Sequence, residues 1–308
     1  MEIFDHPSQL KTDGRRVCVA VGVFDGVHLG HQQVLRQTLA DAQQCEGIPV
    51  AITFDRHPAC VIAPAHAPRM IYPLDKKMET IEALGFRHAY VIPFDEAFSR
   101  RTGEEFITSL VDGFRKLASI CVGSAFTFGH RRSGNVALLQ KLGIENDFQV
   151  HGLAAVSLDG EAVSSTRIRS AIAGGELDAA GQMLGRAYTL GGPVIRGAQL
   201  GRQLGFPTAN IDVADLVTPP HGVYAVHIDG AAGSWRAALN IGVRPTVNDP
   251  EPTLHVEAHL LDHEGDLYGE ELEINFVKPL RSEQKFPDLE ALRKQIAIDV
   301  ADTREAFC

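Results

Sequence analysis

The sequence predicts a two-part protein of the α/β plus β class, with a helix-covered parallel sheet followed by a small antiparallel β-barrel and a terminal helix. Up to about residue 150, short apolar runs alternate with segments of helical periodicity, which is typical of a parallel sheet with helices on both faces. After Gly185 the pattern changes to strands separated by Gly and Pro. Since 308 residues suffice for two domains, we expect domains at 1–186 and 187–308.

The first domain is expected to alternate strands and helices along the chain. The strands are predicted at 17–23, 49–54, 89–92 and 120–122, and the helices at 30–46, 75–84, 103–116 and 136–142. Two short helices at 166–173 and 177–184 follow. In such a sheet, ligands bind beyond the carboxyl ends of the strands.

The second domain is expected to be built from strands at 188–195, 223–228, 236–241, 254–260 and 273–277. Turn signals lie at 229–230 and 248–250. Closure into a barrel would remove the exposed strand edges. An amphipathic helix is predicted at 288–303, with an apolar face made of Leu289, Leu292, Ile296 and Val300.

Composition narrows the class of protein. The net charge is −10, divided into −2 up to residue 186 and −8 beyond it, which argues against a nucleic-acid partner. The five cysteines form no C-x-x-C pair, which argues against a disulfide framework or a cysteine-rich zinc site. No apolar run approaches the roughly 18 residues of a membrane span, and no leader pattern begins the chain. We therefore expect a cytoplasmic protein that has no membrane partner.

The strand at 17–23 leads into a helix start that carries two histidines. His28 and His31 flank Gly30 at a helix N-terminus, where backbone N–H groups and the helix dipole favour an anion. Imidazoles there can donate hydrogen bonds to phosphate oxygens. Neither a P-loop nor a G-x-G-x-x-G motif occurs, which favours nucleotidyl transfer over other phosphate chemistry. The alternative is a pair of ordinary helix-start residues or metal ligands.

A second set of polar residues begins the helix predicted at 166–173. The run S-S-T-R-I-R at 164–169 offers hydroxyls that can cap the helix or bind an anion, and Arg169 can clamp a phosphate. The alternative is a plain N-cap followed by arginines that face solvent. Phe126 and Phe128 similarly favour a place in the core over a ligand platform.

The acidic half contains a Gly-rich turn that ends in Pro207, Thr208 and Asn210. Its hydroxyl and amide oxygens suit Mg²⁺ that bridges nucleotide phosphates, whereas the alternative is an ordinary β-turn. Glu257 lies in a predicted strand, on the same face as His255 and His259. A carboxylate that points into the barrel could take a hydroxyl proton, and the alternative is a surface strand face.

These motifs resemble the bacterial bifunctional riboflavin kinase/FMN adenylyltransferase family, also called FAD synthetases. The matching segments are G-x-F-D-G-x-H-x-G-H at 22–31, G-x-x-x-G-F-P-T-A-N at 201–210, and the segments at 53–58, 122–129, 132–134, 164–169, 222–224, 240–246, 257–262, 267–269 and 280–286. The resemblance spans nearly the whole chain. It implies a Rossmann-like nucleotidyltransferase domain that converts FMN to FAD, and a barrel that phosphorylates riboflavin.

The resemblance also implies site residues. In the first domain it assigns catalysis to His28, His31 and Arg169, ATP binding to Gly22, Phe24, Asp25, Gly30, Ser165 and Thr166, and flavin binding to Asp55, Pro58, Phe126 and Phe128. In the barrel it assigns the general base to Glu257, ATP binding to Gly205, Pro207, Thr208 and Asn210, Mg²⁺ to Thr208 and Asn210, and flavin binding to Arg281 and Arg293. The expected ligands are riboflavin, FMN, FAD, ATP and Mg²⁺, and the chain could be a homo-oligomer.

Two positions depart from the family pattern and supply the alternatives. Ala125 stands where the family commonly has Asp or Asn, and Arg56 where it often has Pro. One alternative is therefore a riboflavin kinase with an impaired adenylyltransferase domain. The other is a flavin-sensing nucleotidyltransferase, against which Thr208, Asn210 and Glu257 argue because a sensor needs neither metal ligands nor a base.

Overall fold

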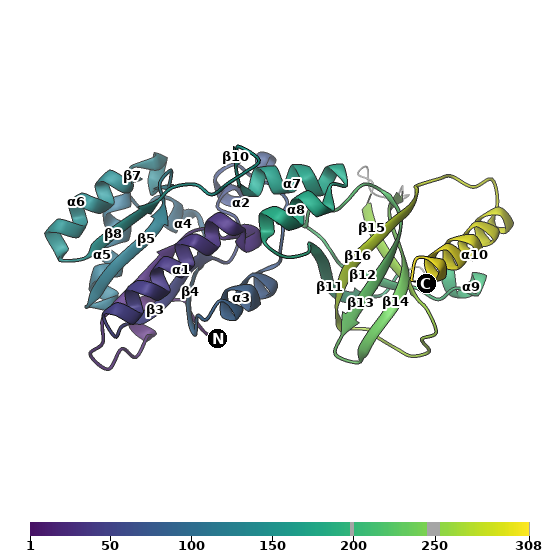
Figure 1. Cartoon of the computed structure of the whole chain (residues 1–308), viewed down its shortest axis with the longest axis horizontal. Helices are drawn as coiled ribbons and strands as arrows, with labels where there is room; N and C mark the ends of the chain where they lie inside the picture. The colour runs from purple at the N-terminus through teal and green to yellow at the C-terminus, as the bar shows by residue number, and fades with distance from the viewer. Residues whose placement is uncertain (198–199, 245–252, 308) are drawn as a thin grey trace. The chain divides into compact units, whose positions relative to one another are not determined.

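The computed structural model describes residues 1–197, 200–244 and 253–307 (Figure 1). By internal packing the chain divides into two compact units, Met1–Ile168 with Met183–Gly185, and Arg169–Gln182 with Arg186–Cys308. The expected boundary between residues 186 and 187 stays a prediction. The turn expected at 248–250, and residues 245–246 of the motif at 240–246, lie outside the described residues.

The first unit contains a six-stranded parallel sheet, which confirms the expected α/β architecture. Its strand order is β1 (Glu2–Phe4), β4 (His88–Ile92), β3 (Ile48–Phe54), β2 (Val17–Val21), β5 (Leu117–Gly123) and β8 (Gln149–Leu153). The sequence did not predict β1 and β8. Both are edge strands with mostly exposed or half-exposed residues, so neither carries the apolar run that marks a buried strand.

Helices cover both faces of this sheet. Side chains of α1 (Leu29–Gln44) and α3 (Leu74–Ala83) share one apolar core with the strands, and side chains of α5 (Gly103–Phe114) and α6 (Val136–Asn146) share the other. Two short helices are α2 (Ala59–Ile62) and α4 (Glu96–Ser99). Two small strand pairs are β6 (Thr127–Phe128) with β7 (Gly134–Asn135), and β9 (Ser157–Leu158) with β10 (Glu161–Ala162). Four single turns of 3-10 helix are η1 (Pro7–Gln9), η2 (Asp25–Val27), η3 (Pro64–His66) and η4 (His130–Arg132). Two further helices, α7 (Ser165–Gly174) and α8 (Leu177–Leu184), follow as predicted.

The second unit contains a closed antiparallel barrel, as the sequence predicts. The strands run in the order β11 (Thr189–Ile195), β12 (Ala209–Ile211), β15 (Thr253–Leu260), β14 (Gly233–Arg244), β13 (Gly222–Gly230) and β16 (Glu271–Ser282), and α9 (Leu200–Leu204) precedes β12. The three-residue β12 was too short to predict. The turn signal at 229–230 correctly marks a hairpin between two strands, but the turn lies slightly later, because Gly230 pairs with Gly233 and the chain reverses at Ala231 and Ala232.

The terminal helix α10 (Leu289–Glu305) packs against β13, β14 and β16. Asp288 caps it by accepting a hydrogen bond from the Ala291 N–H at 2.8 Å. Leu292, Ile296 and Val300 are half-buried as predicted, whereas Leu289 is 57% exposed because the first turn is uncovered. The buried side also carries Asp299 and Thr303, which are 4% and 0% exposed. Among the described residues, no helix combines the length and the apolar character needed to cross a membrane.

Candidate active sites

The N-terminus of α1 places two imidazole rings face to face. His28 is 6% exposed and its Nδ1 accepts a hydrogen bond from the His31 N–H at 3.4 Å, so His28 caps the helix. The rings stack with centroids 3.6 Å apart. A Cβ on Gly30 would lie 3.2 Å from the His28 ring, so glycine leaves room for the stack. Because Nδ1 accepts, the neutral His28 ring carries its proton on Nε2.

His31 is held in its neutral form. Burial is the main cause that lowers its pKa well below the usual 6.5, and the charges of His28 and Lys77 lower it further. Its Nδ1 is buried and has no hydrogen-bond partner within the described residues. A buried polar atom without a partner is costly unless a ligand satisfies it. This atom therefore supports a ligand site at the start of α1.

The turn between β2 and α1 is shaped by Phe24. Its backbone is left-handed at φ +51°, and its ring is 1% exposed and lies edge-on to His31 at 5.3 Å between centroids. A Cβ on Gly22 would lie 2.7 Å from the Phe24 ring, so this close approach needs glycine. Phe24 consequently supports the turn from the core.

Asp25 ties the same turn to two distant segments. Its Oδ1 accepts hydrogen bonds from the N–H groups of Ile71 at 2.9 Å and Tyr72 at 3.4 Å. Its backbone carbonyl accepts from the Ser165 hydroxyl at 3.0 Å, which joins the start of α7 to this turn. The structure thus brings Asp25 and Ser165 together, although 140 positions separate them in the sequence.

The start of α7 confirms the predicted helix cap. The Ser164 hydroxyl accepts a hydrogen bond from the Arg167 N–H at 3.2 Å. Arg167 in turn donates to the carbonyls of Leu158 and Glu161 at 3.0 and 3.2 Å, so it serves the local structure. Thr166 is exposed, and Arg169 is half-buried on α7 within the second compact unit.

Lys77 was not singled out from the sequence, although it is 2% exposed. Its Nζ donates to the carbonyls of Val23 at 3.3 Å and Phe54 at 3.0 Å, and to the Thr53 hydroxyl at 3.1 Å. The available signal was a lysine beside Met78 on the apolar face of a predicted helix. The structure places this amine at the carboxyl ends of β2 and β3.

The expected flavin residues fall into two groups. The rings of Phe126 and Phe128 stack at 5.3 Å, and both pack against the core while staying partly exposed. Their core contacts agree with the expectation that these two rings belong to the core. Ala125 is exposed in the turn immediately before them.

Asp55 follows β3 directly and is half-buried. Its Oδ1 accepts a hydrogen bond from the Phe94 N–H at 2.9 Å, and its Oδ2 pairs with Arg56 at 3.1 Å. Pro58, three residues later, directly precedes the short helix α2 and is also half-buried. Asp55 therefore fixes the loop after β3 to the loop after β4.

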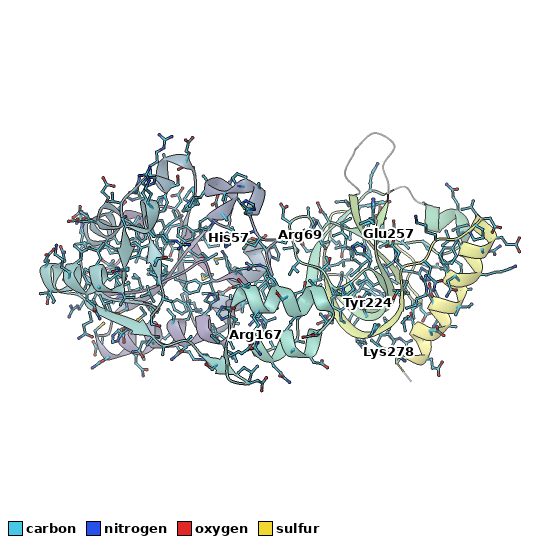
Figure 2. All side chains as sticks on the ribbon, turned by 90° about the horizontal axis from the view of Figure 1, so that it is seen from above. His57, Arg69, Arg167, Tyr224, Glu257 and Lys278 are labelled. Atoms are coloured by element: carbon cyan, nitrogen blue, oxygen red, sulfur yellow. The ribbon has the colours of Figure 1, made fainter. Side chains whose placement is uncertain are left out.

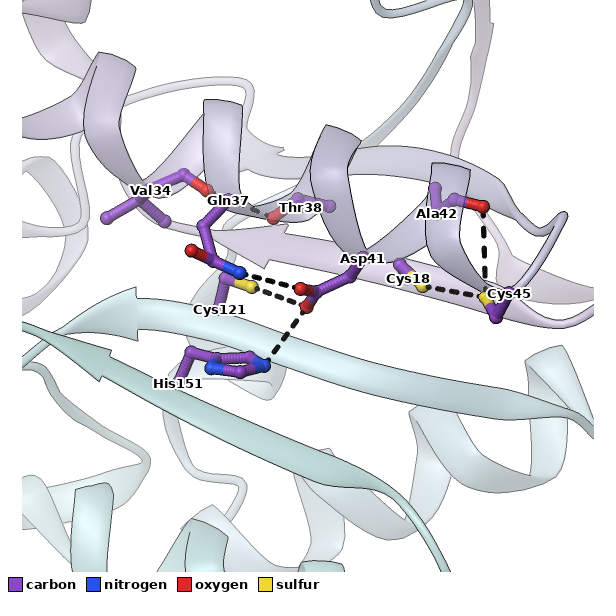
Figure 3. Close-up of polar contacts among 9 residues, drawn as sticks. All are labelled: Cys18, Val34, Gln37, Thr38, Asp41, Ala42, Cys45, Cys121 and His151. Carbon is purple, nitrogen blue, oxygen red and sulfur yellow. Dashed lines mark hydrogen bonds and ion pairs between the residues drawn. The ribbon is translucent and has the colours of Figure 1, made fainter.

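Three thiols, of which Cys18 and Cys121 are buried and Cys45 is half-buried, lie beside the C-terminal part of α1 (Figure 3). The Sγ atoms of Cys18 and Cys45 are 3.6 Å apart, and the Sγ of Cys121 lies 3.3 Å from the Asp41 carboxylate. Asp41 also lies 3.3 Å from His151. Burial raises the pKa of Cys18 and of Cys121 to about 12. These thiols are protonated at neutral pH and are poor nucleophiles.

In the barrel, Glu257 (labelled in Figure 2) lies between two asparagines on neighbouring strands. It pairs in register with Asn210 of β12 on one side and with Asn240 of β14 on the other. Directly opposed residues of antiparallel strands project to the same face, so the three side chains form a polar row. All three are half-buried.

The expectation that Glu257 points into the barrel is wrong. Along β15 the buried residues are Val256, Ala258 and Leu260, which face the apolar interior. Strand alternation therefore puts Glu257 on the outer face, together with the half-buried His255 and His259 as predicted. A barrel of only six strands is filled by its own side chains, so the site has to lie outside.

The loop that precedes β12 is fixed against this outer face. His259 Nδ1 lies 2.8 Å from the Pro207 carbonyl, and its ring meets Phe206 edge-on at 5.6 Å. Gly205 adopts φ +89°, which favours glycine. A Cβ on Gly201 would lie 3.2 Å from the Thr208 hydroxyl. The loop thus holds Thr208 and the start of β12 beside Glu257's strand.

Arg281 links β16 to the terminal helix. Its Nε and one terminal nitrogen donate to the two oxygens of Asp299, each at 2.7 Å, and both side chains are largely buried. Gln295 also donates to Asp299, at 3.0 Å. Arg293, the other expected flavin residue, is exposed on α10. Asp299 and Asn240 had no role in the sequence-based site, because their partners lie on other elements.

Comparisons with known proteins match the two parts of the chain to two families. A family model described as FAD synthetase matches residues 10–167, and one described as riboflavin kinase matches residues 184–307. The chain is 39% identical to a bifunctional riboflavin kinase/FMN adenylyltransferase of Pseudomonas fluorescens, and the match covers 94% of this chain and 93% of the relative. The protein of the same name from Escherichia coli K12 is 36% identical with the same coverage. A crystal structure described as a macrolide-efflux protein from Streptococcus pneumoniae superposes with a TM-score of 0.81 at 27% identity, over 98% of both chains.

Proposed function

The chain belongs to the family of bifunctional riboflavin kinases/FMN adenylyltransferases, and we propose that it performs both reactions of that name. The barrel transfers the γ-phosphate of ATP to riboflavin and forms FMN and ADP. The N-terminal domain transfers the AMP part of a second ATP to FMN and forms FAD and pyrophosphate. The observation that carries the proposal is the presence of two separate polar sites, each built around the family motif.

Adenylyl transfer is assigned to the start of α1. An oxygen of the FMN phosphate attacks the α-phosphorus of ATP. The bond between this phosphorus and the oxygen that joins it to the β-phosphate breaks, and pyrophosphate leaves. FMN phosphate is already anionic, so no protein base is needed. We assign stabilisation of the developing charge to His28 and His31 with the N–H groups of α1, since fixed donors act strongly in a buried site. Arg169 is the proposed phosphate clamp.

The remaining residues of this site have supporting roles in the proposal. The proposed ATP site is lined, through close backbone approach or hydroxyl groups, by Gly22, Gly30, Ser165 and Thr166. The turn that carries it is supported from the protein interior by the buried Phe24 and Asp25. The flavin ring is proposed to contact the loop residues Asp55, Pro58, Phe126 and Phe128.

Phosphoryl transfer is assigned to the polar row on the outer face of the barrel. Glu257 accepts the proton of the ribityl 5′-hydroxyl while that oxygen attacks the γ-phosphorus and ADP leaves. Gly205 and Pro207 shape the proposed nucleotide loop, and Arg281 and Arg293 are proposed to contact flavin. The position of Glu257 between two amides, half-open to solvent, gives a hydroxyl substrate access to the carboxylate.

Mg²⁺ fits the oxygen donors beside Glu257. No group of three or more His, Cys, Asp or Glu side chains gathers as a metal cage within residues 1–197, 200–244 and 253–307. Mg²⁺ commonly keeps several waters and is held by one or two protein ligands together with substrate phosphates. We therefore propose Thr208 and Asn210 as its protein ligands. When bound, the ion neutralises charge on the nucleotide phosphates.

The domain division and the location in the cell also stay proposals. We propose functional domains at 1–186 and 187–308, in keeping with the family models that end at residue 167 and begin at residue 184. The buried, protonated thiols suit the reducing cytoplasm.

Chromatographic separation of flavins tests the proposal on the full chain. With riboflavin, ATP and Mg²⁺, FMN is expected to rise first and then to give way to FAD. FMN that accumulates without FAD would favour a kinase with an impaired adenylyltransferase domain, the alternative that Ala125 suggests. Absence of FMN would contradict the kinase assignment.

A further inference from the structure

Lys77 lies where the pairing of two central strands ends. The ladder between β2 and β3 runs to Val21 opposite Ile52, and the last backbone bond joins the Gly22 N–H to the Ile52 carbonyl at 3.1 Å. Beyond this point β2 ends and its backbone leaves as a loop, whereas β3 continues to Phe54, where it pairs with β4. The loop after β2 belongs to the segment at 22–31, to which we assign ATP contacts. The segment at 53–58, to which we assign flavin contacts, begins with the last two residues of β3.

The Lys77 amine provides the next connection between the strands. It donates to the Val23 carbonyl on one side and to the Phe54 carbonyl and the Thr53 hydroxyl on the other. The Thr53 hydroxyl itself donates to the Val23 carbonyl at 2.9 Å, so the link is a closed network. An ammonium group has three N–H donors, and here three acceptors surround it.

We propose that Lys77 is a positioning residue of the adenylyltransferase site, whose charged amine fixes the spacing between the ATP loop after β2 and the end of β3, from which the flavin loop starts. The inference rests on the proposed function of the N-terminal domain. A neutral amine has only two N–H donors, so deprotonation removes one of the three contacts. The spacing of the two loops then depends on the charge of Lys77.

The charges around Lys77 make this dependence observable. Burial lowers the pKa of Lys77 from 10.5 to about 8, although the carboxylates of Asp25 and Asp55 act in the opposite direction. The charge of Lys77 also lowers the pKa of His31, which lies well below 6.5, so His31 stays neutral in the pH range where Lys77 titrates. Lys77 loses its proton as the pH rises through about 8.

The folded-state pKa of Lys77 is depressed, which has a consequence for stability. The unfolded chain binds the proton more tightly, so the charged amine disfavours folding below pH 8. This cost disappears as the pH rises from about 8 towards 10.5. A buried charge that opposes folding at neutral pH is typical of a functional position.

The test compares pH profiles of FMN-to-FAD conversion in the full chain, with riboflavin phosphorylation as the internal control for folding. The wild type should lose FAD formation with a midpoint near pH 8. Thr53→Val removes an acceptor that favours the charged amine, so the midpoint should move to lower pH. Lys77→Arg keeps a charge because an arginine side chain stays protonated at every accessible pH, so the alkaline loss should disappear.

Lys77→Met should lower kcat/KM for FAD formation by roughly 100-fold, the effect of a displacement of about 1 Å in a reacting pair. Riboflavin phosphorylation should stay within about twofold in every variant, and Lys76→Met, at the neighbouring position of α3, should leave both activities unchanged. An alkaline midpoint that neither Thr53→Val nor Lys77→Arg moves would overturn the inference, as would full FAD formation by Lys77→Met.

Failure of the proposed function gives a different result. A wild type that forms no FAD at any pH contradicts the adenylyltransferase assignment itself. Affinity for added FAD, measured by flavin fluorescence over the same pH range, then decides the role of Lys77. FAD binding that weakens near pH 8 and shifts with Thr53→Val supports the positioning role, and a flat profile overturns it.

Discussion

The two proposed sites solve phosphate chemistry in different surroundings. At the start of α1 the polar groups are buried, with His28 6% and Lys77 2% exposed, and they lie at the carboxyl ends of parallel strands. On the barrel, Asn210, Glu257 and Asn240 form a half-exposed row on an outer face. This difference in burial matches the different nucleophiles of the two proposed reactions. An anionic phosphate needs fixed donors that oppose its charge, whereas a neutral hydroxyl needs a base that it can reach.

The two folds also offer different places for a ligand. A parallel sheet gathers loops and helix N-termini at one edge, so the first site forms there. The small barrel is filled by residues such as Val256 and Leu260, so its polar row is on the outside. That outer face is bounded by α10, which is joined to β16 by the Arg281–Asp299 pair.

The substitution Glu257→Gln is expected to have the largest effect and tests whether the two sites act independently. Loss of the base should lower riboflavin phosphorylation by about 10³-fold, within the range of general base catalysis, while FMN-to-FAD conversion stays unchanged. Initial rates measured separately with riboflavin and with FMN would show this. His255→Gln, two positions earlier on the same face of β15, is the matched control. Parallel loss of both activities in a folded variant would contradict two independent sites.

A second test acts on the other region. His31→Ala should lower FAD formation by about 10²-fold, comparable with removal of one oxyanion donor, and should leave FMN formation unchanged. Because burial keeps the pKa of His31 well below 6.5, wild-type FAD formation should show no acid loss near pH 6.5 from this residue. His66→Ala changes an exposed histidine of the same unit and serves as the control. An acid midpoint near 6.5 that His31→Ala abolishes would refute the neutral role.

The sequence was most informative where neighbours in the chain are neighbours in space. Apolar periodicity located the four central strands of the sheet, because each is buried on both faces. The strands β1, β8 and β12 were missed because they are short or exposed, so they carry no such signal. Alternation also grouped His255, Glu257 and His259 on one face. It could not tell the inside from the outside, since that depends on how the barrel closes.

The proposed site residues divide in the same way. His28 and His31 share one motif and could be read together, whereas the acceptors of Lys77 lie 23 to 54 positions away. Likewise Asp299 acquires its meaning only from Arg281, which lies on another element. A residue whose role depends on contacts with distant segments can be identified only once the structure shows those contacts.

The smallest expected effect concerns the attachment of α10 to the barrel. Asp299→Asn removes the charge and one acceptor oxygen from the buried pair with Arg281, which is a proposed flavin contact. A hydrogen bond to a charged group contributes about 1.5–3 kcal/mol, and Asn keeps one of the two acceptor oxygens, so we expect the lower end of this range. The value of kcat/KM for riboflavin should then fall about 10-fold, mainly through KM. Steady-state rates with riboflavin, and with FMN as the control reaction, would measure it.

The same helix provides a matched comparison for this prediction. Asp262 pairs with Arg304 of α10 at 2.6 Å, but both side chains are about half exposed. Exposed ion pairs contribute about 0–1 kcal/mol, so Asp262→Asn should change riboflavin kinetics by less than about fivefold. Equal effects of the two substitutions would mean that any α10 contact suffices. A larger loss in Asp299→Asn would instead show that the orientation of Arg281 sets flavin affinity, so that the open site on the barrel also depends on one buried charge pair.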